Sequence, residues 1–392
     1  MASHLRHLTV DDGSTAWLWV IDQPGSQMTE WVAMSRTVSP PLVVALSGGV
    51  DSAVAAARAS EAGFALTAVH LALSTPTSPA GYERAEQARA DAERVAAHLG
   101  LPFLVWDFRA EFAATVVAGF EAEYARGRTP NPCLTCNRTI KFGAVLDRAL
   151  GLGFGGVVTG HYAIRVDRGD VAELHRGADP AKDQSYVLAV LGQDRLRHAY
   201  FPLGPSLKSA VRREAADRGL PVANRPDSSD ICFIAEGNAA TYLRERLGIA
   251  PGVIVDGDGT VVGGHDGTYG FTIGQRRGLR LGRPAGDGAP RYVVGLDPVT
   301  RTVTVGPHEA LRVGRLWARD PIWMDEPPAG GFTGDVQVRA HAVPQPCHAE
   351  VESDRVRVDF DAPAYGIAPG QTAVLYDGTR VVGAMTIDST GG

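Results

Sequence analysis

The chain contains 392 residues, of which 21% are charged and 44% hydrophobic, and its formal net charge at pH 7 is -6. This length and composition are typical of an ordinary globular protein with two or three domains. No apolar stretch approaches the length of a membrane span, so we expect no membrane association. The negative net charge excludes a chain-wide positive field and leaves any RNA contact to local basic faces.

Residues 1–39 fit no domain. Their apolar run at 16–21 is too short for a signal peptide, and no cleavage-site pattern frames it. We expect this leader to be disordered and without function, either a species-specific extension or the product of a start codon placed too early. Without a secretory signal, the protein is expected in the cytoplasm, where cysteines more often serve chemistry or metal binding than structural disulfides.

Residues 40–160 alternate between predicted strands and helices. Helices at about 52–62 and 85–99 separate the predicted strands, which are 42–46, 66–71, 101–105 and 156–159. This alternation predicts a parallel sheet that is covered by helices on both faces. Ligands of such sheets bind at the carboxyl ends of the strands, where Ser47, Leu71 and the pair Gly160-His161 fall.

The first strand leads into Ser47-Gly48-Gly49-Val50-Asp51-Ser52, and a predicted helix follows. Two glycines let the backbone approach a polyanion, and the helix start offers free N–H groups and the positive end of its dipole. These features predict a phosphate cradle. The segment lacks the Gly-Lys-Ser/Thr ending of a Walker A loop and instead resembles the PP-loop of ATP pyrophosphatases, which cleave ATP between the α- and β-phosphates.

The second half of the chain has a different texture. A helix is predicted at about 206–219, with Lys208, Arg212 and Arg213 on it. After about residue 250 the pattern changes to short β-rich runs with glycine turns, and from about 311 the runs alternate with period two. We expect this last part to form a small β-barrel.

The four cysteines are Cys133 and Cys136 in a CxxC on a proline-stiffened loop, Cys232 on a second loop, and Cys347 as inert packing in the β-rich tail. A zinc site needs a fourth ligand, and a thioredoxin-like CxxC begins a helix after a strand. An iron–sulfur cluster on three cysteines stays open as an alternative. The interpretation we favour is a pair of redox-active thiols, one on each loop, that face each other over the ATP site.

Across residues 40–392 the chain resembles the tRNA-specific 2-thiouridylase family. The resemblance is carried, in family order, by ALSGGVDS, NPCLTCN, TGHY, AKDQSY, DSSDICF, TIGQRRGL, RYVVGLD and APGQTAVLY. It implies an α/β fold, with a parallel-sheet PP-loop domain of the adenine nucleotide alpha hydrolase type, a small central domain and a C-terminal β-barrel. The expected divisions are a leader at 1–39, an ATP-binding catalytic domain at 40–235, a central tRNA-contacting domain at 236–305 and the barrel at 306–392.

The resemblance also implies residue roles. Cys136 matches the nucleophile and Cys232 the persulfide carrier. ATP, with Mg²⁺, would be held by Ala45, Leu46, Ser47, Gly48, Gly49, Val50, Asp51, Ser52, Leu71 and Gly160. The target base would face Asn131, Pro132 and Cys133, with His161 close to it. Further tRNA contacts would come from Lys182, Asp183, Gln184, Arg339 and Gln371.

Two positions depart from the family pattern. Many members have Asp where this chain has Cys133, and an aromatic residue often stands where it has Ala340. Basic side chains outside the motifs are expected to hold the phosphates of the anticodon stem: Lys208, Arg212 and Arg213 on one helix, and Arg276, Arg277, Arg280 and Arg283 in the central domain.

The implied reaction is ATP-dependent 2-thiolation of the wobble uridine of tRNA. ATP adenylates the base 2-oxygen, and sulfur arrives as a cysteine persulfide supplied by a cysteine desulfurase or a sulfur relay protein. The competing interpretation is a PP-loop synthetase or amidotransferase-type enzyme that adenylates a small molecule. Such a mechanism needs no cysteines, so Cys136 and Cys232 distinguish the two.

Overall fold

The computed structural model describes residues 3–9, 15–21, 40–75, 78–227, 231–234, 239–282 and 288–391. Its first domain, which we name the sheet domain, is built on a parallel sheet of order β5-β4-β3-β6-β9. The bounds are β3 Leu42–Ala45, β4 Leu66–Ala72, β5 Phe103–Asp107, β6 Val157–Val158 and β9 Ala199–Tyr200. The predicted parallel sheet is confirmed, while the two-residue strand β9 was not predicted.

Alternate residues of the strands supply two hydrophobic cores. Val44 packs with helices α1, α2 and α9, whereas its neighbour Val43 packs with α5 and α6 on the other face. The helices of the first face are α1 Val50–Glu61, α2 Pro79–His98 and α9 Lys208–Asp217. Helix α2 starts earlier than predicted because Ser78 accepts a hydrogen bond from Gly81 N at 3.2 Å and Pro79 occupies the first helical position.

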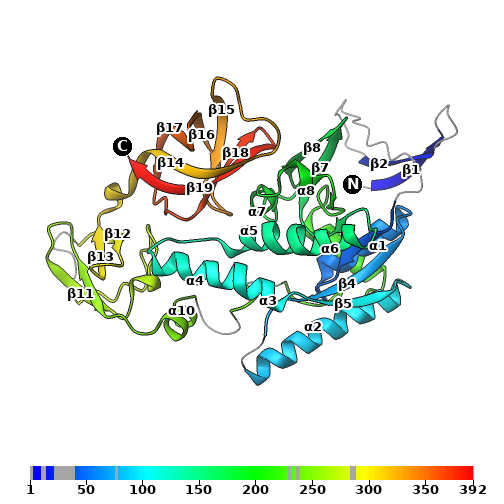
Figure 1. Cartoon of the computed structure of the whole chain (residues 1–392), viewed down its shortest axis with the longest axis horizontal. Coiled ribbons are helices and arrows are strands. Elements are labelled where there is room, and N and C mark those ends of the chain that lie inside the picture. Colours follow the sequence, from blue (N-terminus) through cyan, green and yellow to red (C-terminus); the bar gives the residue numbers. More distant parts are fainter. Residues whose placement is uncertain are drawn as a thin grey trace.

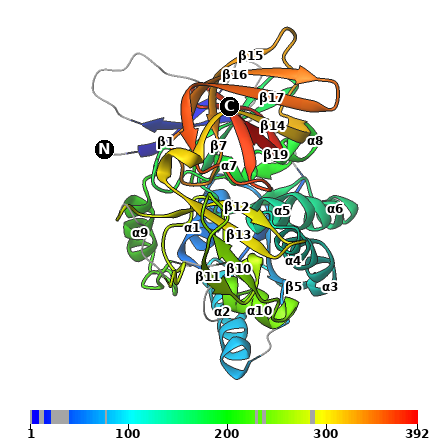
Figure 2. The same ribbon diagram turned by 90° about the vertical axis from the view of Figure 1, so that its left-hand side faces the viewer.

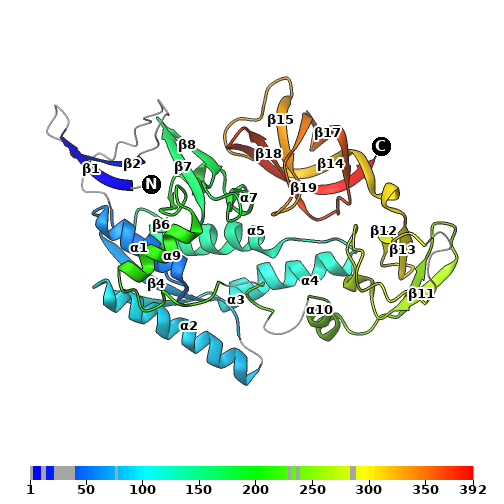
Figure 3. The ribbon, with the colours of Figure 1, turned by 180° about the vertical axis from the view of Figure 1, so that it is seen from behind.

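The opposite face carries two long helical runs. The first is α3 Arg109–Phe112, a π-helical segment η1 Ala113–Val117 and α4 Ala118–Ala125; the second is α5 Pro132–Cys136, a π-helical segment η2 Asn137–Ala144 and α6 Val145–Gly151. Seen from behind, α4 extends away from the sheet toward the central domain, and α5 begins beneath the barrel (Figure 3). These runs therefore connect all three domains.

The C-terminal domain is a closed antiparallel barrel, as predicted. Its strand order is β14-β17-β16-β15-β18-β19, and pairing of β14 with β19 closes it. The bounds are β14 Arg312–Trp323, β15 Phe332–Gln337, β16 Gln345–Glu352, β17 Arg355–Tyr365, β18 Thr372–Asp377 and β19 Arg380–Gly391. The barrel lies at the upper left of Figure 1, above α4, and at the top of Figure 2, and α2 lies at the bottom of both views. Cys347 is buried in the barrel core, as predicted.

A hairpin of the sheet domain extends the barrel sheet. Strands β7 Ala163–Arg168 and β8 Val171–Arg176 pair with each other, and β8 joins β19. Short helices α7 Ser185–Leu188 and α8 Gly192–Leu196 follow. The Cζ atom of Arg176 lies 3.6 Å from the ring centre of Tyr376, and Tyr186 donates to Thr372 O at 2.8 Å. The sheet domain and the barrel are thus packed into one body.

The central domain contains a four-stranded sheet of order β11-β10-β13-β12. Its elements are α10 Ala239–Leu247, β10 Gly252–Val255, β11 Val261–His265, η3 Thr268–Gly270, β12 Tyr292–Asp297, β13 Thr302–Gly306 and η4 His308–Leu311. Strands β1 Ser3–Thr9 and β2 Thr15–Ile21 of the leader, for which disorder was expected, pair as an antiparallel hairpin, and β2 is rich in strand-forming Thr, Trp, Val and Ile. Among the described residues, no helix is long and apolar enough to cross a membrane.

Gly160 follows β6 and lies against the start of α1. A Cβ atom at this position would meet Asp51 C and Ser52 N at 2.7 Å, closer than real contacts allow. By contrast, a Cβ atom at Gly119 in α4 would meet nothing within 4 Å. Only a residue without a side chain lets the end of β6 approach the first turn of α1 this closely.

We therefore expect Gly160→Ala to lower the free energy of unfolding by about 1–3 kcal/mol, because backbone atoms must move to accept the methyl group. Gly119→Ala, the matched control, should raise it by about 0.5–1 kcal/mol, since alanine is the better helix former. Urea denaturation of both variants measures the two effects. Equal stability of the two variants would contradict the close approach.

Candidate active site

Two serine side chains shape the phosphate loop, residues 47–52. The hydroxyl of Ser52 accepts from Ser47 N at 3.2 Å and donates to Gly49 O at 3.0 Å, while Gly49 N donates to the Ser47 hydroxyl at 3.3 Å. Gly49 is the N-cap of α1 and provides no side-chain cap. The N–H groups of the first helical turn therefore remain available to an anion. Leu46 and Val50 are buried, so only their backbone can serve a ligand.

Helix α2 packs directly on this loop. Gly48 has a φ of +77°, and a Cβ atom there would lie 2.4 Å from Ala88 O. Arg225 donates to Gly48 O at 3.0 Å and to the buried carboxylate of Asp91 in α2. Neither Asp91 nor Arg225 was singled out from the sequence, because no motif links two residues that are 134 positions apart. Together they hold the loop backbone in its glycine-dependent shape.

An ionic network surrounds Asp51. Lys208 Nζ bonds both Asp51 oxygens at 2.6 and 2.7 Å and lies 2.9 Å from Asp227, while the Tyr162 hydroxyl donates to Asp51 at 2.7 Å. Lys182 Nζ also lies 3.0 Å from Asp227. Burial opposes the charge on Asp227, but hydrogen bonds from Lys208 and Lys182 outweigh it and hold the pKa of this carboxyl well below its usual value.

This network corrects one expectation. Lys208 is only 9% exposed and points to the phosphate loop, so its ammonium is not available to the anticodon stem. Arg212 is also engaged, with Asp227 and with Arg225 O. A helical pattern in the sequence shows which residues share a face of the helix, but it does not show what packs against that face. Here the face of α9 that bears Lys208 packs against the phosphate loop. Arg283 and residues 228–230 of the DSSDICF motif lie outside the described residues.

The CxxC was predicted to lie in a loop, and this prediction was wrong. Its residues form helix α5, in which Asn131 is the N-cap and accepts from Cys133 N at 3.0 Å, and Pro132 occupies the first turn. Asn-Pro is a signal for a helix start as much as for a loop, which sequence reasoning overlooked. The helix exposes Cys133 and buries Cys136.

The segment that leads into α5 is held by both accessory domains. Thr129 N donates to Pro369 O of the barrel at 2.9 Å, and Thr129 O accepts from Gln371 at 2.6 Å. Its hydroxyl lies 3.2 Å from that of Thr272 in the central domain. The start of the CxxC helix is thus positioned by the barrel and by the central domain together.

Cys232 lies near Cys136 because its neighbour Phe233 is anchored. The ring of Phe233 makes edge contacts with those of Phe112, Phe120 and Tyr242, at centroid distances of 5.8, 5.4 and 5.6 Å. The side chain of Cys232 reaches solvent, but desolvation of its sulfur by the surrounding atoms, together with the charge that Cys136 can acquire, raises the pKa of this thiol to about 11. Burial also raises the pKa of Cys136. The two thiols are thus close enough for the charge of one to affect the other, while their role as a redox pair stays a prediction.

His161 is 7% exposed and contacts Lys141, whose charge also acts on Cys136 and Cys232. Its Nδ1 lies 2.8 Å from the Thr159 hydroxyl, and its Nε2 lies 3.5 Å from Lys141 Nζ. Burial, aided by the charge of Lys141, holds the pKa of His161 well below its usual value. The imidazole is therefore neutral. Lys141 is a member of this site that sequence reasoning missed.

A cavity of about 470 Å³ lies where α5 meets the barrel. It is lined by Asn131, Arg339, Ala340, His341, Ala342 and Gln371. Three residues predicted to contact tRNA, namely Asn131, Arg339 and Gln371, are thus brought together. Arg339 donates to the backbone oxygens of Ile273 and Gly366, so it also ties the barrel to the central domain.

Two other predicted tRNA contacts have internal partners. Asp183 accepts from Gly177 N at 2.9 Å and from Ser185 N at 3.0 Å, and Gln184 accepts from Tyr162 N at 2.9 Å. Leu71 is partly exposed at the end of β4, near the phosphate loop strand. Any tRNA contact of Asp183 and Gln184 stays a prediction.

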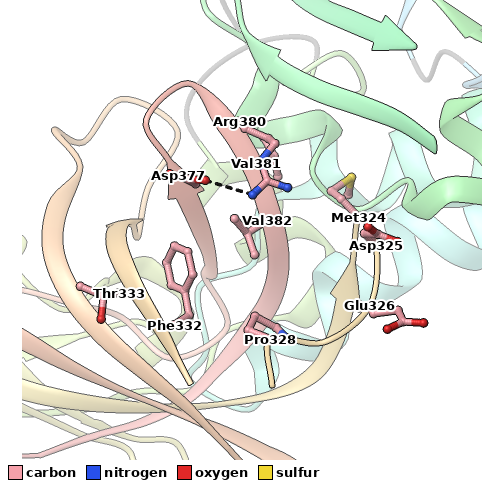
Figure 4. Close-up of a pocket in the computed structure, with 10 residues that line it drawn as sticks. All are labelled: Met324, Asp325, Glu326, Pro328, Phe332, Thr333, Asp377, Arg380, Val381 and Val382. Atoms are coloured by element: carbon pink, nitrogen blue, oxygen red, sulfur yellow. Dashed lines mark hydrogen bonds and ion pairs between the residues drawn. The ribbon is translucent and has the colours of Figure 1, made fainter. Parts of the chain in front are cut away.

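A second cavity, of about 360 Å³, lies at one end of the barrel (Figure 4). Arg380 and Asp377 form an ion pair of 3.0 Å on its wall, and none of the predicted site residues lines it. Within the described residues, no group of three or more His, Cys, Asp or Glu side chains is arranged to hold a metal ion.

Comparison with known proteins follows the domain divisions. Residues 41–236 match a family model described as the tRNA methyl transferase HUP domain, and residues 240–307 match the tRNA methyl transferase PRC-barrel domain. Residues 313–387 match the aminomethyltransferase beta-barrel domain.

Curated relatives match over nearly their whole length. The chain is 57% identical over 355 residues to the tRNA-specific 2-thiouridylase MnmA of Acidothermus cellulolyticus, covering 89% of this chain and 98% of that protein. It is 56% identical over 361 residues to the protein of the same name from a Nocardioides species, with the same coverage. For that of Streptomyces coelicolor the identity is 54% over 371 residues, with 93% and 98% covered.

We expect mild oxidation of the purified protein to link Cys136 with Cys232, as mapped by peptide mass spectrometry. Phe233→Ala should slow this linkage about tenfold, equivalent to about 1.4 kcal/mol, because the variant loses the ring contacts that position Cys232. Phe360→Ala, at a partly buried position in the barrel core, is the control for general loss of stability. Linkage at the unmodified rate in Phe233→Ala would argue against the anchor.

Proposed function

The chain belongs to the tRNA-specific 2-thiouridylase family, and we propose that it catalyses ATP-dependent 2-thiolation of the wobble uridine of tRNA. The observation that carries this proposal is the pair Cys136 and Cys232, held near each other in the domain that contains the phosphate loop. Methyl transfer, which the family-model description names, requires no such pair of thiols. Sulfur transfer through a persulfide requires both.

ATP fits the phosphate loop, since the start of α1 has no side-chain cap and its N–H groups are available to phosphates. The uridine 2-oxygen is a poor leaving group, and adenylation converts it to AMP with release of pyrophosphate. Lys208 is placed to stabilise charge that develops on the pyrophosphate. Mg²⁺ would neutralise phosphate charge, with carboxylate oxygens of Asp51 and Asp227 as its hard donors.

The cavity at the start of α5 is the proposed place of the target base. Asn131, Arg339 and Gln371 line it and would contact the RNA, and Pro132 and Cys133, which follow Asn131 at the start of α5, would lie next to the base. A wobble base must leave its stack to reach the thiols, at a cost of a few kcal/mol, which single-stranded loops keep small.

Sulfur transfer then proceeds in two steps. The terminal sulfur of a Cys232 persulfide attacks C2 and displaces AMP, so that a disulfide joins Cys232 to the base. Cys136 thiolate attacks the Cys232 sulfur and forms the Cys136–Cys232 disulfide, and the electron pair of the broken bond leaves on 2-thiouridine. Two thiols are oxidised and the transferred sulfur is reduced, so a cellular reductant must restore the thiols. A persulfide suits the attack because it is more acidic than a thiol.

A sulfur donor must load Cys232 in each turnover. We propose a cysteine desulfurase or a sulfur relay protein, acting in the cytoplasm. Cys232 is suited to receive sulfur because its side chain is exposed, whereas that of Cys136 is buried.

Cys136→Ser and Cys232→Ser should each lower 2-thiouridine formation at least about a hundredfold, while ATP-dependent pyrophosphate release survives. The reason is that activation and sulfur transfer use different groups. Nucleoside mass spectrometry and a pyrophosphate assay measure the two activities separately, with Cys347→Ala as the control. Normal thiolation by Cys232→Ser would refute the persulfide assignment.

Asp51→Asn should lower pyrophosphate release about a hundredfold without unfolding the protein, since Asp51 serves the phosphate loop and orients Lys208. Asp107→Asn is the matched control, because Asp107 is an exposed carboxylate at a strand end that pairs only at the surface with Arg109. Circular dichroism checks the fold. An unfolded Asp51→Asn would show that this carboxylate is structural.

A further inference from the structure

Lys141 is a partly buried cation at the thiol site. Its Nζ lies 3.5 Å from Nε2 of His161. No carboxylate within 4.0 Å pairs with Lys141 in the part of the chain that the structure describes, although most lysine and arginine side chains around the phosphate loop have such partners. An ammonium without a carboxylate is free to serve an anion that arrives or forms during the reaction.

The π-helical segment η2 directs this ammonium toward the thiols. Cys136 ends α5, and Lys141 lies five residues later, inside Asn137–Ala144. In an α-helix, residues five apart point about 140° away from each other. The i→i+5 turn of a π-helix brings them toward one face. The unusual turn thus places Lys141 on the side of the helix that bears Cys136.

His161 fixes the other side of the ammonium. Its neutral ring accepts from Lys141 at Nε2, so Nδ1 carries the proton and donates to the Thr159 hydroxyl. The titratable groups that share this space are His161, Cys133, Cys136 and Cys232. Because His161 is uncharged, the positive charge that acts on Cys136 and Cys232 is that of Lys141.

We propose that Lys141 is a positioning residue for sulfur transfer, whose ammonium stabilises the anionic sulfur of Cys136 and of Cys232. The proposal rests on the proposed function for its role in catalysis. It adds no covalent step, because the lysine keeps its protons and acts only by its charge and its position.

The electrostatics of the site explain why such a cation is needed. Desolvation raises the pKa of both thiols, Cys136 and Cys232. The charge of Lys141 acts in the opposite direction and lowers both pKa values. Only the ionised sulfur is a nucleophile. Without Lys141, desolvation would act unopposed, and the reactive form would be rarer at neutral pH.

The test is the pH dependence of iodoacetamide alkylation in the full chain, resolved for each cysteine by mass spectrometry. In Lys141→Met, alkylation of Cys136 and Cys232 at pH 8 should fall about tenfold, and both profiles should move to higher pH. Lys141→Arg should restore most of the rate, because it keeps the charge. Arg138→Gln is the matched control, since it removes an exposed cation from the same helix.

Thiolation and pyrophosphate release are measured on the same variants. Loss of thiolation in Lys141→Met, with pyrophosphate release retained and activity recovered in Lys141→Arg, supports the proposal. Unchanged alkylation profiles in Lys141→Met would overturn it, whatever the effect on thiolation. Alkylation needs neither ATP nor tRNA, so the effect of Lys141 on the thiols is measured separately from the enzyme's activity. If the wild-type chain formed no 2-thiouridine, the proposed function would be refuted, and the alkylation result would still stand.

Discussion

The whole site depends on how the chain enters the CxxC helix. Thr129 is bonded to the barrel through its backbone and approaches the central domain through its hydroxyl, two residues before the N-cap Asn131. These contacts fix the start of α5, and α5 in turn sets the positions of Cys133 and Cys136. Because the barrel and the central domain both hold the start of α5, the positions of these two domains determine the positions of Cys133 and Cys136. The accessory domains therefore help to shape the candidate active site.

The two chemical centres use opposite electrostatic designs. Around the phosphate loop, Lys208 bridges Asp51 and Asp227, so charges of both signs are packed together and partly satisfied. At the thiols, burial keeps sulfur and His161 neutral, and Lys141 is the nearby positive charge. The first design suits a polyanionic leaving group, and the second suits a nucleophile that must ionise only when needed. This division explains why adenylation and sulfur transfer can be served by different groups in one domain.

Local patterns predicted the local structure well. The apolar runs before Ser47 and before Leu71 became β3 and β4, and period-two alternation predicted the barrel. Features that depend on distant contacts were missed: β9 has only two residues, and the hairpin β7–β8 joins a barrel strand that is about 200 positions away. Lys141 escaped notice because helix-period reasoning looks three or four residues ahead, whereas a π-turn aligns residues five apart. Lys208 was assigned to the surface because its helix was considered without its neighbours.

The junction between β8 and β19 has a consequence for how the chain can be divided. Arg176 N donates to Thr379 O at 2.9 Å, and His175 pairs with Arg380. If residues after about 310 were removed, the end of β8 at His175 and Arg176 would become an open edge with unpaired backbone groups, and the ring of Tyr186 would lose its barrel partner. Open edges of this kind recruit other strands and promote aggregation. The sheet domain is therefore a poor candidate for an independent folding unit, and a shortened gene product would be expected to accumulate in insoluble form.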